Sequence, residues 1–124
     1  YGAGNIPCTS TRHGNPYGLE ETISTLVEEN IPVGITTRCV VGAAEMGAYE
    51  NNAAARDAGA MILNDMITET AYIKLSWVLA NRDLWPKEAK RAAEGGPGYT
   101  GAVRKAMLDP VAGEVSRGEE MYQI

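Results

Sequence analysis

A short β-branched segment lies between two stretches with helical character, and this alternation constrains the fold more than any other feature of the chain. Apolar residues recur at helical spacing over residues 18–29, and the β-branched run of residues 33–37 follows. An alanine-rich stretch over residues 51–57 predicts a further helix, and residues 61–63 predict a minimal strand or an extended arm. A short β-branched strand fits a buried parallel sheet better than a surface sheet. The sequence therefore predicts an α/β fold, a short parallel sheet flanked by helices.

A strongly periodic helix is predicted that includes residues 71–79. The residues expected to share its inward face are Ala71, Tyr72, Leu75, Val78 and Leu79. Asp65 or Thr68 is placed to cap its first turn. Asp65 and Glu69, near Lys74, could form an acid/base pair, but carboxylates at this place usually stabilise a helix terminus. Capping is therefore the expected role.

Turn-forming residues mark the remaining helix boundaries. Asn30, shortly before a proline, is expected to end the first helix, and Gly59 to end the alanine-rich helix. Pro86 is expected in the first turn of a short helix, and Thr100 is expected to cap a last helix over residues 100–108. No internal repeat and no linker divides the chain, which predicts one domain.

The charge balance argues against binding to polyanions. Lys and Arg number 11 against 16 Asp and Glu, so the formal net charge of the 124 residues is −5, and no basic run exceeds a pair. We therefore expect no direct nucleic-acid binding. The longest run without polar side chains, residues 39–44, is too short to span a bilayer, and no basic-then-apolar leader is recognisable, so no membrane contact is expected. Cys8 and Cys39 fit no disulfide framework, which favours a reducing cytoplasm.

Polar residues beside the predicted strands are binding candidates, but they form no complete catalytic set. Asn5 ends a glycine-rich turn, and its amide could recognise a carboxylate or an amino group, or merely close the turn. Tyr49 and Glu50 belong to a polar cluster after the first predicted strand. Cys39, at the end of that strand, could be a nucleophile. A buried structural role is favoured, because cysteine is among the most commonly buried residues. The single His, His13, lies in a polar loop, so neither a metal site nor a cofactor is expected.

Several segments form an ordered set of motifs: residues 1–7 (YGAGNIP), residues 32–42 (PVGITTRCVVG), Tyr49, and above all residues 65–75 (DMITETAYIKL). Together they resemble the C-terminal domain of the L-asparaginase/glutaminase family, most of all its cytoplasmic type and the related D subunit of archaeal glutamyl-tRNA amidotransferase. The resemblance covers residues 1–80, and residues 111–115 resemble the closing segment of the family.

The resemblance implies a Rossmann-like fold and an amidohydrolase that cleaves the side-chain amide of L-asparagine through a threonine nucleophile. That threonine belongs to an N-terminal domain of such enzymes, so the resemblance implies that this chain holds no catalytic residue and is inactive alone. Asn5 matches a family asparagine that reaches across a dimer interface to the substrate, so the resemblance implies the same role for Asn5. Tyr49 and Glu50 stand where the secreted type supplies a substrate-binding Glu, and Tyr49 matches the cytoplasmic and tRNA-linked branches. Thr37 and Cys39 are candidates for an effector pocket.

The resemblance also implies partners. Residues 1–124 are expected to be a single asparaginase-type C-terminal domain, a fragment of a longer protein whose first strand would lie ahead of Tyr1. An N-terminal catalytic domain or a companion chain would supply the rest, in a homodimer or tetramer that acts on a small amino-acid amide. Two alternatives stay open: the D subunit of the amidotransferase, and a non-catalytic ligand-binding or assembly module of the same fold.

Overall fold

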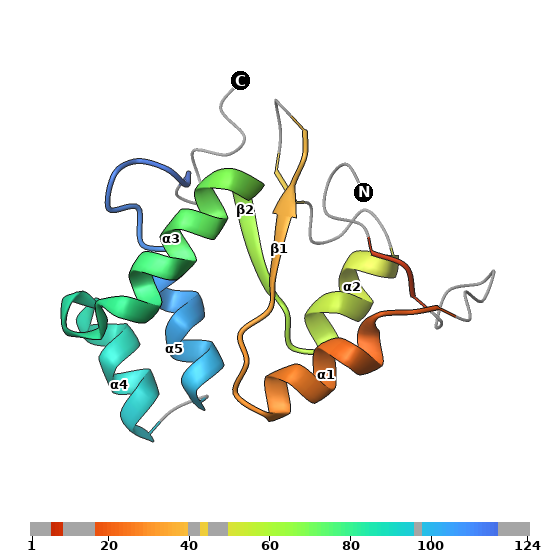
Figure 1. Cartoon of the computed structure of the whole chain (residues 1–124), viewed down its shortest axis with the longest axis horizontal. Coiled ribbons are helices and arrows are strands. Elements are labelled where there is room, and N and C mark those ends of the chain that lie inside the picture. The colour runs from red at the N-terminus through yellow and green to blue at the C-terminus, as the bar shows by residue number, and fades with distance from the viewer. Residues whose placement is uncertain (1–5, 9–16, 40–42, 45–49, 96–97, 117–124) are drawn as a thin grey trace.

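The computed structural model describes residues 6–8, 17–39, 43–44, 50–95 and 98–116. These residues form a two-stranded parallel sheet with helices on both sides (Figure 1). In chain order the elements are α1 (Glu20–Glu28), β1 (Gly34–Thr37), α2 (Glu50–Asp57), β2 (Met61–Ile67), α3 (Thr68–Ala80), the 3-10 helix η1 (Arg82–Leu84), α4 (Lys87–Gly95) and α5 (Gly98–Met107). The predicted α/β fold with a short parallel sheet is confirmed.

The helices α1 and α2 end in the same way. The second residue after each helix adopts a left-handed backbone, Asn30 with a φ of 61° and Gly59 with a φ of 98°. The N–H group of the residue that follows then donates to a carbonyl five residues back, at 2.8 Å after α1 and 3.0 Å after α2. These bonds satisfy carbonyls that the last helical turn leaves unpaired. Both predicted helix ends are confirmed.

The strand β2 is longer and less regular than the minimal strand predicted over residues 61–63. The residues that pair across the sheet are Gly34 with Met61, Ile35 with Ile62, and Thr37 with Ile67. Between the second and third pairs, β1 advances by two residues and β2 by five, so residues 63–66 form a bulge. The polar Asn64 and Asp65 look like the end of a strand in the sequence, but they occupy this bulge, and the strand resumes after them.

The predicted capping of α3 is wrong. Ile67 precedes the helix, and no side chain caps the first turn. Thr68 is the first helical residue, and its hydroxyl lies 2.8 Å from the hydroxyl of Thr36 on β1. The Asp65 carboxylate accepts hydrogen bonds from Ser116 instead.

The predicted inward face of α3 is only partly right. Its buried residues are Ala71, Lys74 and Val78, whereas Tyr72 is 75% exposed and Leu79 is 36% exposed. The prediction fails because apolar residues lie on nearly every side of this helix, so their spacing alone does not choose the buried side. A lysine occupies a place in the buried stripe that an apolar side chain would ordinarily take.

The last helices form a hairpin against α3. The predicted short helix is present as α4, but it starts at Lys87, so Pro86 precedes the first turn rather than lying in it. The helix α5 starts at Gly98 and contains Thr100, which is therefore not its cap as the sequence predicted. Trp85 lies between η1 and α4, and its indole N–H donates to the backbone carbonyl of Val78 at 2.7 Å. This bond ties the chain at the start of the hairpin to the last turn of α3.

Two hydrophobic clusters hold the fold. The large cluster joins β2 to α3, α4 and α5, and its buried residues are Met61, Leu63, Met66, Ala71, Val78, Trp85, Ala89, Ala92, Ala102, Val103, Ala106, Met107 and Val115. The small cluster joins α1 to α2 and consists of Ile23, Ala55 and Ala60, with Val27 and Ile35 among the partly buried residues packed against it. The two clusters lie on different sides of the sheet (Figure 1).

Candidate functional site

The first part of the candidate site is the carboxyl end of β1. Thr37, the last residue of this strand, is fully buried. Its hydroxyl accepts a hydrogen bond from the Cys39 backbone N–H at 3.0 Å, which fixes how the chain leaves the sheet. Cys39 is half-buried and its thiol is free. The structure thus brings the two residues predicted for an effector pocket together at the sheet edge where open parallel sheets bind ligands.

A pair of hydroxyl groups lies beside this edge. Thr36 of β1 and Thr68 of α3 are 2.8 Å apart at their Oγ1 atoms, and one donates to the other. Both hydroxyls are exposed, so they can also bond a polar ligand or water. This pair joins the end of β1 to the first turn of α3.

The predicted substrate-binding residues are not located by the structure. Asn5 and Tyr49 lie outside the described residues, as does His13. Glu50 is the first residue of α2, but the structure does not describe its side chain. The roles assigned to Asn5, Tyr49 and Glu50 therefore stay predictions.

The other cysteine is unsuited to nucleophilic chemistry. Cys8 is buried, and its thiol lies 3.7 Å from the Ile6 carbonyl oxygen. Burial raises the pKa of the Cys8 thiol, and the nearby Glu20 carboxylate raises it further. The thiolate, which is the reactive form, is therefore disfavoured.

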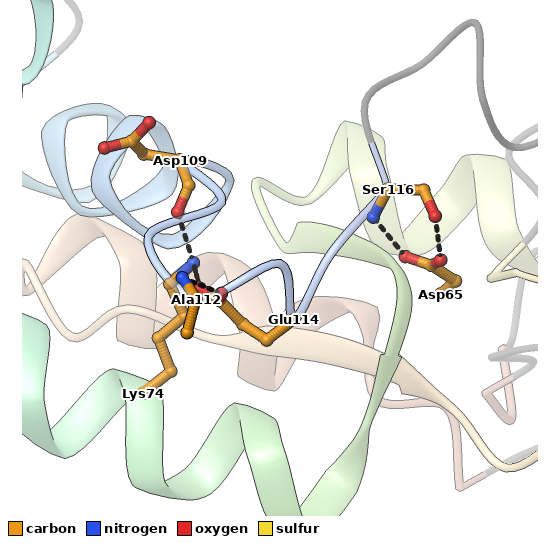
Figure 2. A network of polar contacts seen from close by, with 6 residues as sticks. All are labelled: Asp65, Lys74, Asp109, Ala112, Glu114 and Ser116. Carbon is orange, nitrogen blue, oxygen red and sulfur yellow. Dashed lines mark hydrogen bonds and ion pairs between the residues drawn. The ribbon is translucent and has the colours of Figure 1, made fainter.

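A second polar group of residues lies between α3 and residues 111–116, which we call the strap (Figure 2). The Lys74 side chain is only 6% exposed, and its ammonium pairs with the Glu114 carboxylate. The same ammonium donates to the Asp109 carbonyl oxygen at 2.5 Å, and the Glu114 carboxylate accepts from the Ala112 N–H at 2.7 Å. These bonds fold the strap onto α3.

The pairing with Lys74 decides the charge state of Glu114. Burial by itself raises the pKa of the Glu114 carboxyl. Hydrogen bonds from Lys74 and from the backbone N–H groups of Glu114 and Ala112, together with the positive charge of Lys74, outweigh burial and hold the pKa below its ordinary value. Glu114 is therefore ionised at neutral pH.

The strap ends at the bulge of β2. One oxygen of the Asp65 carboxylate accepts the Ser116 backbone N–H at 2.9 Å, and the other accepts the Ser116 hydroxyl proton (Figure 2). Asp65 and Ser116 are 51 positions apart in the sequence. The structure thus places Asp65 in a tertiary contact at the bulge, where the sequence predicted a local cap.

Sequence reasoning missed Lys74 and the strap residues as an interacting set. The spacing of Lys74 from Ala71 and Val78 could have revealed its burial, because the three residues share one helical stripe. A buried lysine requires a carboxylate partner, but nothing local indicates which one. Ser116 carries no signal in the sequence that would connect it to Asp65.

Metal-binding groups and membrane-spanning helices are both absent from the described part of the chain. No group of three or more His, Cys, Asp and Glu residues there could hold a metal ion. Among the helices of the described ranges, none has both the length and the apolar character needed to cross a membrane.

Comparison with protein families and curated proteins gives a consistent result. The sequence model described as the Glutaminase/Asparaginase C-terminal domain matches residues 1–92. The D subunit of glutamyl-tRNA(Gln) amidotransferase from Pyrococcus abyssi is 31% identical over 101 residues, which cover 82% of this chain and 20% of that protein. The protein of the same name from Saccharolobus islandicus is 39% identical over 106 residues, with 80% and 20% covered. The chain thus spans about a fifth of the length of these relatives.

Solved structures agree with the sequence comparison. The thermostable L-asparaginase from Thermococcus kodakarensis matches 94% of this chain and 29% of its own, with a TM-score of 0.66 and 30% sequence identity. L-asparaginase I from Vibrio cholerae matches 94% of this chain and 28% of its own, with a TM-score of 0.63. Its sequence identity of 24% supports the fold alone.

Proposed function

Because the chain belongs to the Glutaminase/Asparaginase C-terminal domain family, we propose that it is the dimerising, site-completing part of an asparaginase-like amidohydrolase. The complete enzyme hydrolyses L-asparagine to L-aspartate and ammonia in the cytoplasm. The observation that carries the proposal is the similarity to the Thermococcus L-asparaginase in both fold and sequence over 94% of this chain.

The proposed reaction needs residues that this chain does not contain. A threonine hydroxyl from the N-terminal part attacks the side-chain amide carbon, the C–N bond breaks, and the nitrogen leaves as ammonia after taking up a proton. Water then cleaves the resulting ester, which restores the threonine and releases L-aspartate. The C-terminal part contributes substrate contacts from Asn5, Tyr49 and Glu50, and an effector pocket near Thr37 and Cys39. The position of Thr37 and Cys39 at the carboxyl end of β1 supports that assignment.

A second candidate function is a role as part of a tRNA-dependent amidotransferase. The sequence relatives named above are D subunits of such amidotransferases at 31% and 39% identity, which favours this reading. The same hydrolysis would then supply ammonia to a partner enzyme. A non-catalytic ligand-binding or assembly module of the same fold is the third candidate, and it predicts no ammonia release.

Ammonia release from the complete protein tests these readings. The protein is purified from its native source, its polypeptides are identified by intact mass, and release is measured with L-asparagine and L-glutamine. Release with a companion polypeptide or a longer chain supports the amidohydrolase, whereas release that requires a second enzyme favours the amidotransferase. A protein that binds either amino acid without releasing ammonia would contradict both.

Replacement of Asn5 tests the role assigned to this chain. Asn5→Ala in the complete protein should lower kcat/KM by about tenfold to a thousandfold, because an unpaired group in a substrate site weakens transition-state binding by roughly 1.4 to 4 kcal/mol. Asn81→Ala is a matched control, since the Asn81 amide only donates to the Trp77 carbonyl at the end of α3. Ordinary kinetics in Asn5→Ala would remove Asn5 from the site.

A further inference from the structure

We propose that Arg56 and Arg104 form a binding site for a small dianion, of which inorganic phosphate is the simplest example. The two arginines come from α2 and α5, and both line one cavity of about 200 Å³. The site uses none of the residues assigned to the amide substrate or to the effector pocket. The inference therefore goes beyond the proposed function and does not rest on it.

The cavity lies at the amino end of β2, the opposite edge of the sheet from Thr37 and Cys39 (Figure 1). Residues 59–62, which lead from α2 into β2, line one part of it. Thr100 and Arg104 line another part, and because they are four residues apart on α5 they share one side of that helix. The cavity thus joins the end of α2 to α5.

The charge of this cavity is unbalanced. Its charged lining residues are Arg56 and Arg104, and no Asp or Glu is found among the described residues that line it. Two other cavities each carry two basic and two acidic side chains: Arg82, Lys90, Asp83 and Glu94 in one, and Arg104, Lys105, Glu88 and Asp109 in the other. In a chain with a net charge of −5, two guanidinium groups beside one cavity without a carboxylate favour an anionic ligand.

The Arg104 guanidinium is available to such a ligand. It makes no hydrogen bond or ion pair with any other residue that the structure describes. A guanidinium presents five N–H donors in a planar fork that matches two oxygens of a phosphate or a carboxylate. The Thr100 hydroxyl, beside Arg104 in the lining, adds a further donor.

Arg56 already has a partner, but a weak one. Its Nε and Nη2 atoms each lie 3.1 Å from Oδ1 of the neighbouring Asp57. The two side chains are 46% and 69% exposed, and ion pairs with such exposure contribute little stability. The pair also leaves other N–H groups of Arg56 unused. Asp57 therefore competes with a bound anion for Arg56, and it does so without a strong hold.

The size of the cavity selects a small ligand. Pockets for drug-sized molecules measure about 300 to 1,000 Å³, whereas this cavity measures about 200 Å³. A phosphate ion or a short dicarboxylate is small enough for it, and a nucleotide is too large. Two guanidinium groups together balance a charge of −2, and each can bind two oxygens, so an oxygen-bearing dianion is favoured over chloride.

A bound dianion would connect the two sides of the sheet. Arg56 follows Ala55, which belongs to the small cluster, and Arg104 follows Val103, which belongs to the large cluster. An anion held by both arginines is lost when either side opens. Binding should therefore slow the opening of both sides.

Calorimetric titration of the complete protein with inorganic phosphate tests the site. We expect saturable binding with a Kd of about 1 mM or tighter. Arg104→Ala should weaken phosphate binding about tenfold or more, because it removes charge-assisted hydrogen bonds. Arg91→Ala is the matched control: Arg91 is an exposed arginine of α4 that lines none of these cavities, and its loss changes the net charge equally. Its Kd should stay within about twofold of the wild type.

A change at Asp57 should act in the opposite direction. Asp57→Asn should strengthen phosphate binding about threefold, because Arg56 then loses the competing carboxylate. Asp83→Asn, at an exposed acid on η1, makes the same change in net charge and should leave the Kd nearly unchanged.

Hydrogen exchange locates the bound ion within the complete protein. The Ala60 N–H donates to the Ala55 carbonyl oxygen at 3.0 Å, directly beside the cavity. Phosphate at ten times its Kd should slow exchange of this amide about elevenfold, and the same concentration should slow it only about twofold in Arg104→Ala.

Succinate in place of phosphate distinguishes the two sources of a dianion. Tighter binding of phosphate would identify a tetrahedral oxyanion as the ligand, and tighter binding of succinate a dicarboxylate. Either result supports the site, provided that Arg104→Ala weakens the binding and Arg91→Ala does not.

Three outcomes would overturn the proposal. The first is the absence of saturable binding of either anion up to about 10 mM. The second is an equal loss in Arg104→Ala and Arg91→Ala, since net charge alone would then attract the anion. The third is an unchanged Kd in Asp57→Asn, which would remove Arg56 from the site. Phosphate binding in a protein that releases no ammonia would contradict the proposed function alone and leave this inference in place.

Discussion

The two sides of the sheet are held by different means. The side formed by α3, α4 and α5 buries large side chains, among them Met66, Trp85 and Met107, and adds the buried Lys74 and Glu114 pair. The side formed by α1 and α2 buries Ile23 and two alanines. Alanine removes little apolar area from water, so the small cluster contributes less to stability. The helices α1 and α2 therefore depend more on their helix-ending bonds and should open at a lower free energy.

The largest expected effect comes from breaking the buried ion pair. Lys74→Ala leaves the Glu114 carboxylate buried without its cation, which should lower the opening free energy of α3 to α5 by about 3 to 5 kcal/mol. Native-state hydrogen exchange of the complete protein measures this for each helix separately. The double variant Lys74→Met with Glu114→Leu should recover most of the loss, because two apolar side chains need no ionic partner. A loss below about 1 kcal/mol in Lys74→Ala would mean that the pair is exposed in solution.

A pair of core truncations compares the two clusters directly. Met107→Ala should cost about 2 to 5 kcal/mol in α3 to α5, because Met107 is fully buried and its removal leaves a cavity. Ile23→Ala should cost about 2 kcal/mol, at the lower end of that range, with the effect confined to α1 and α2. Exchange measured helix by helix distinguishes the two patterns. Equal losses throughout the chain in both variants would show that the clusters unfold as one unit.

Glycine replacements sharpen the comparison at a smaller scale. A Cβ on Gly59 would lie 2.9 Å from Cγ1 of Val27, and Gly59 has a left-handed backbone. Gly59→Ala should therefore cost more than the roughly 1 to 2 kcal/mol that such a backbone costs an alanine. Gly113→Ala is the matched control, because Gly113 has a φ of 74° and its Cβ would meet no atom within 4 Å. The loss of stability in Gly59→Ala minus the loss in Gly113→Ala measures how tightly Val27 of α1 packs against the end of α2. Equal losses in the two variants would mean that this packing is loose.

The smallest expected effect is a pH dependence confined to the strap. The folded pKa of Glu114 lies below its unfolded value, so the stabilisation is complete above the ordinary glutamate pKa of about 4.3. It is lost as the pH falls through the lowered folded pKa. The opening free energy of α3 should therefore decline on acidification, and Glu114→Gln should flatten that decline. Exchange in α1 and α2 serves as the internal reference, since Glu114 does not contact them in the described structure; an equal decline there would assign the effect to other groups.

The sequence predicts the elements well where one local signal decides them. Asn30 and Gly59 end their helices as expected, because a left-handed residue after a helix is a local event. The sequence underestimates the length of β2 because Asn64 and Asp65 have poor strand propensity, and only their tertiary contacts explain their place in a strand. It places Tyr72 on the wrong side of α3 for a related reason, since a helix that is apolar all round does not reveal its buried side.

The candidate site is predicted only in part. Thr37 and Cys39 lie at the end of β1 as expected, because the carboxyl end of a strand follows from chain order alone. The links from Lys74 to Glu114 and from Asp65 to Ser116 join residues at least 40 positions apart. The chemistry of a buried charged side chain indicates that it has a polar partner, but the sequence does not indicate which residue that partner is. The roles of Asn5, Tyr49 and Glu50 stay predictions for the experiments above.

The link between Ser116 and Asp65 also sets how mechanical force travels through the molecule. The strap follows α5 in the chain, yet its last described residue is bonded to β2 and not to a helix. A pull on the backbone after Ser116 is therefore carried first by two hydrogen bonds to the Asp65 carboxylate, and through them by the central sheet. Tension from any attached partner or surface would reach the bulge before it could unwind α5.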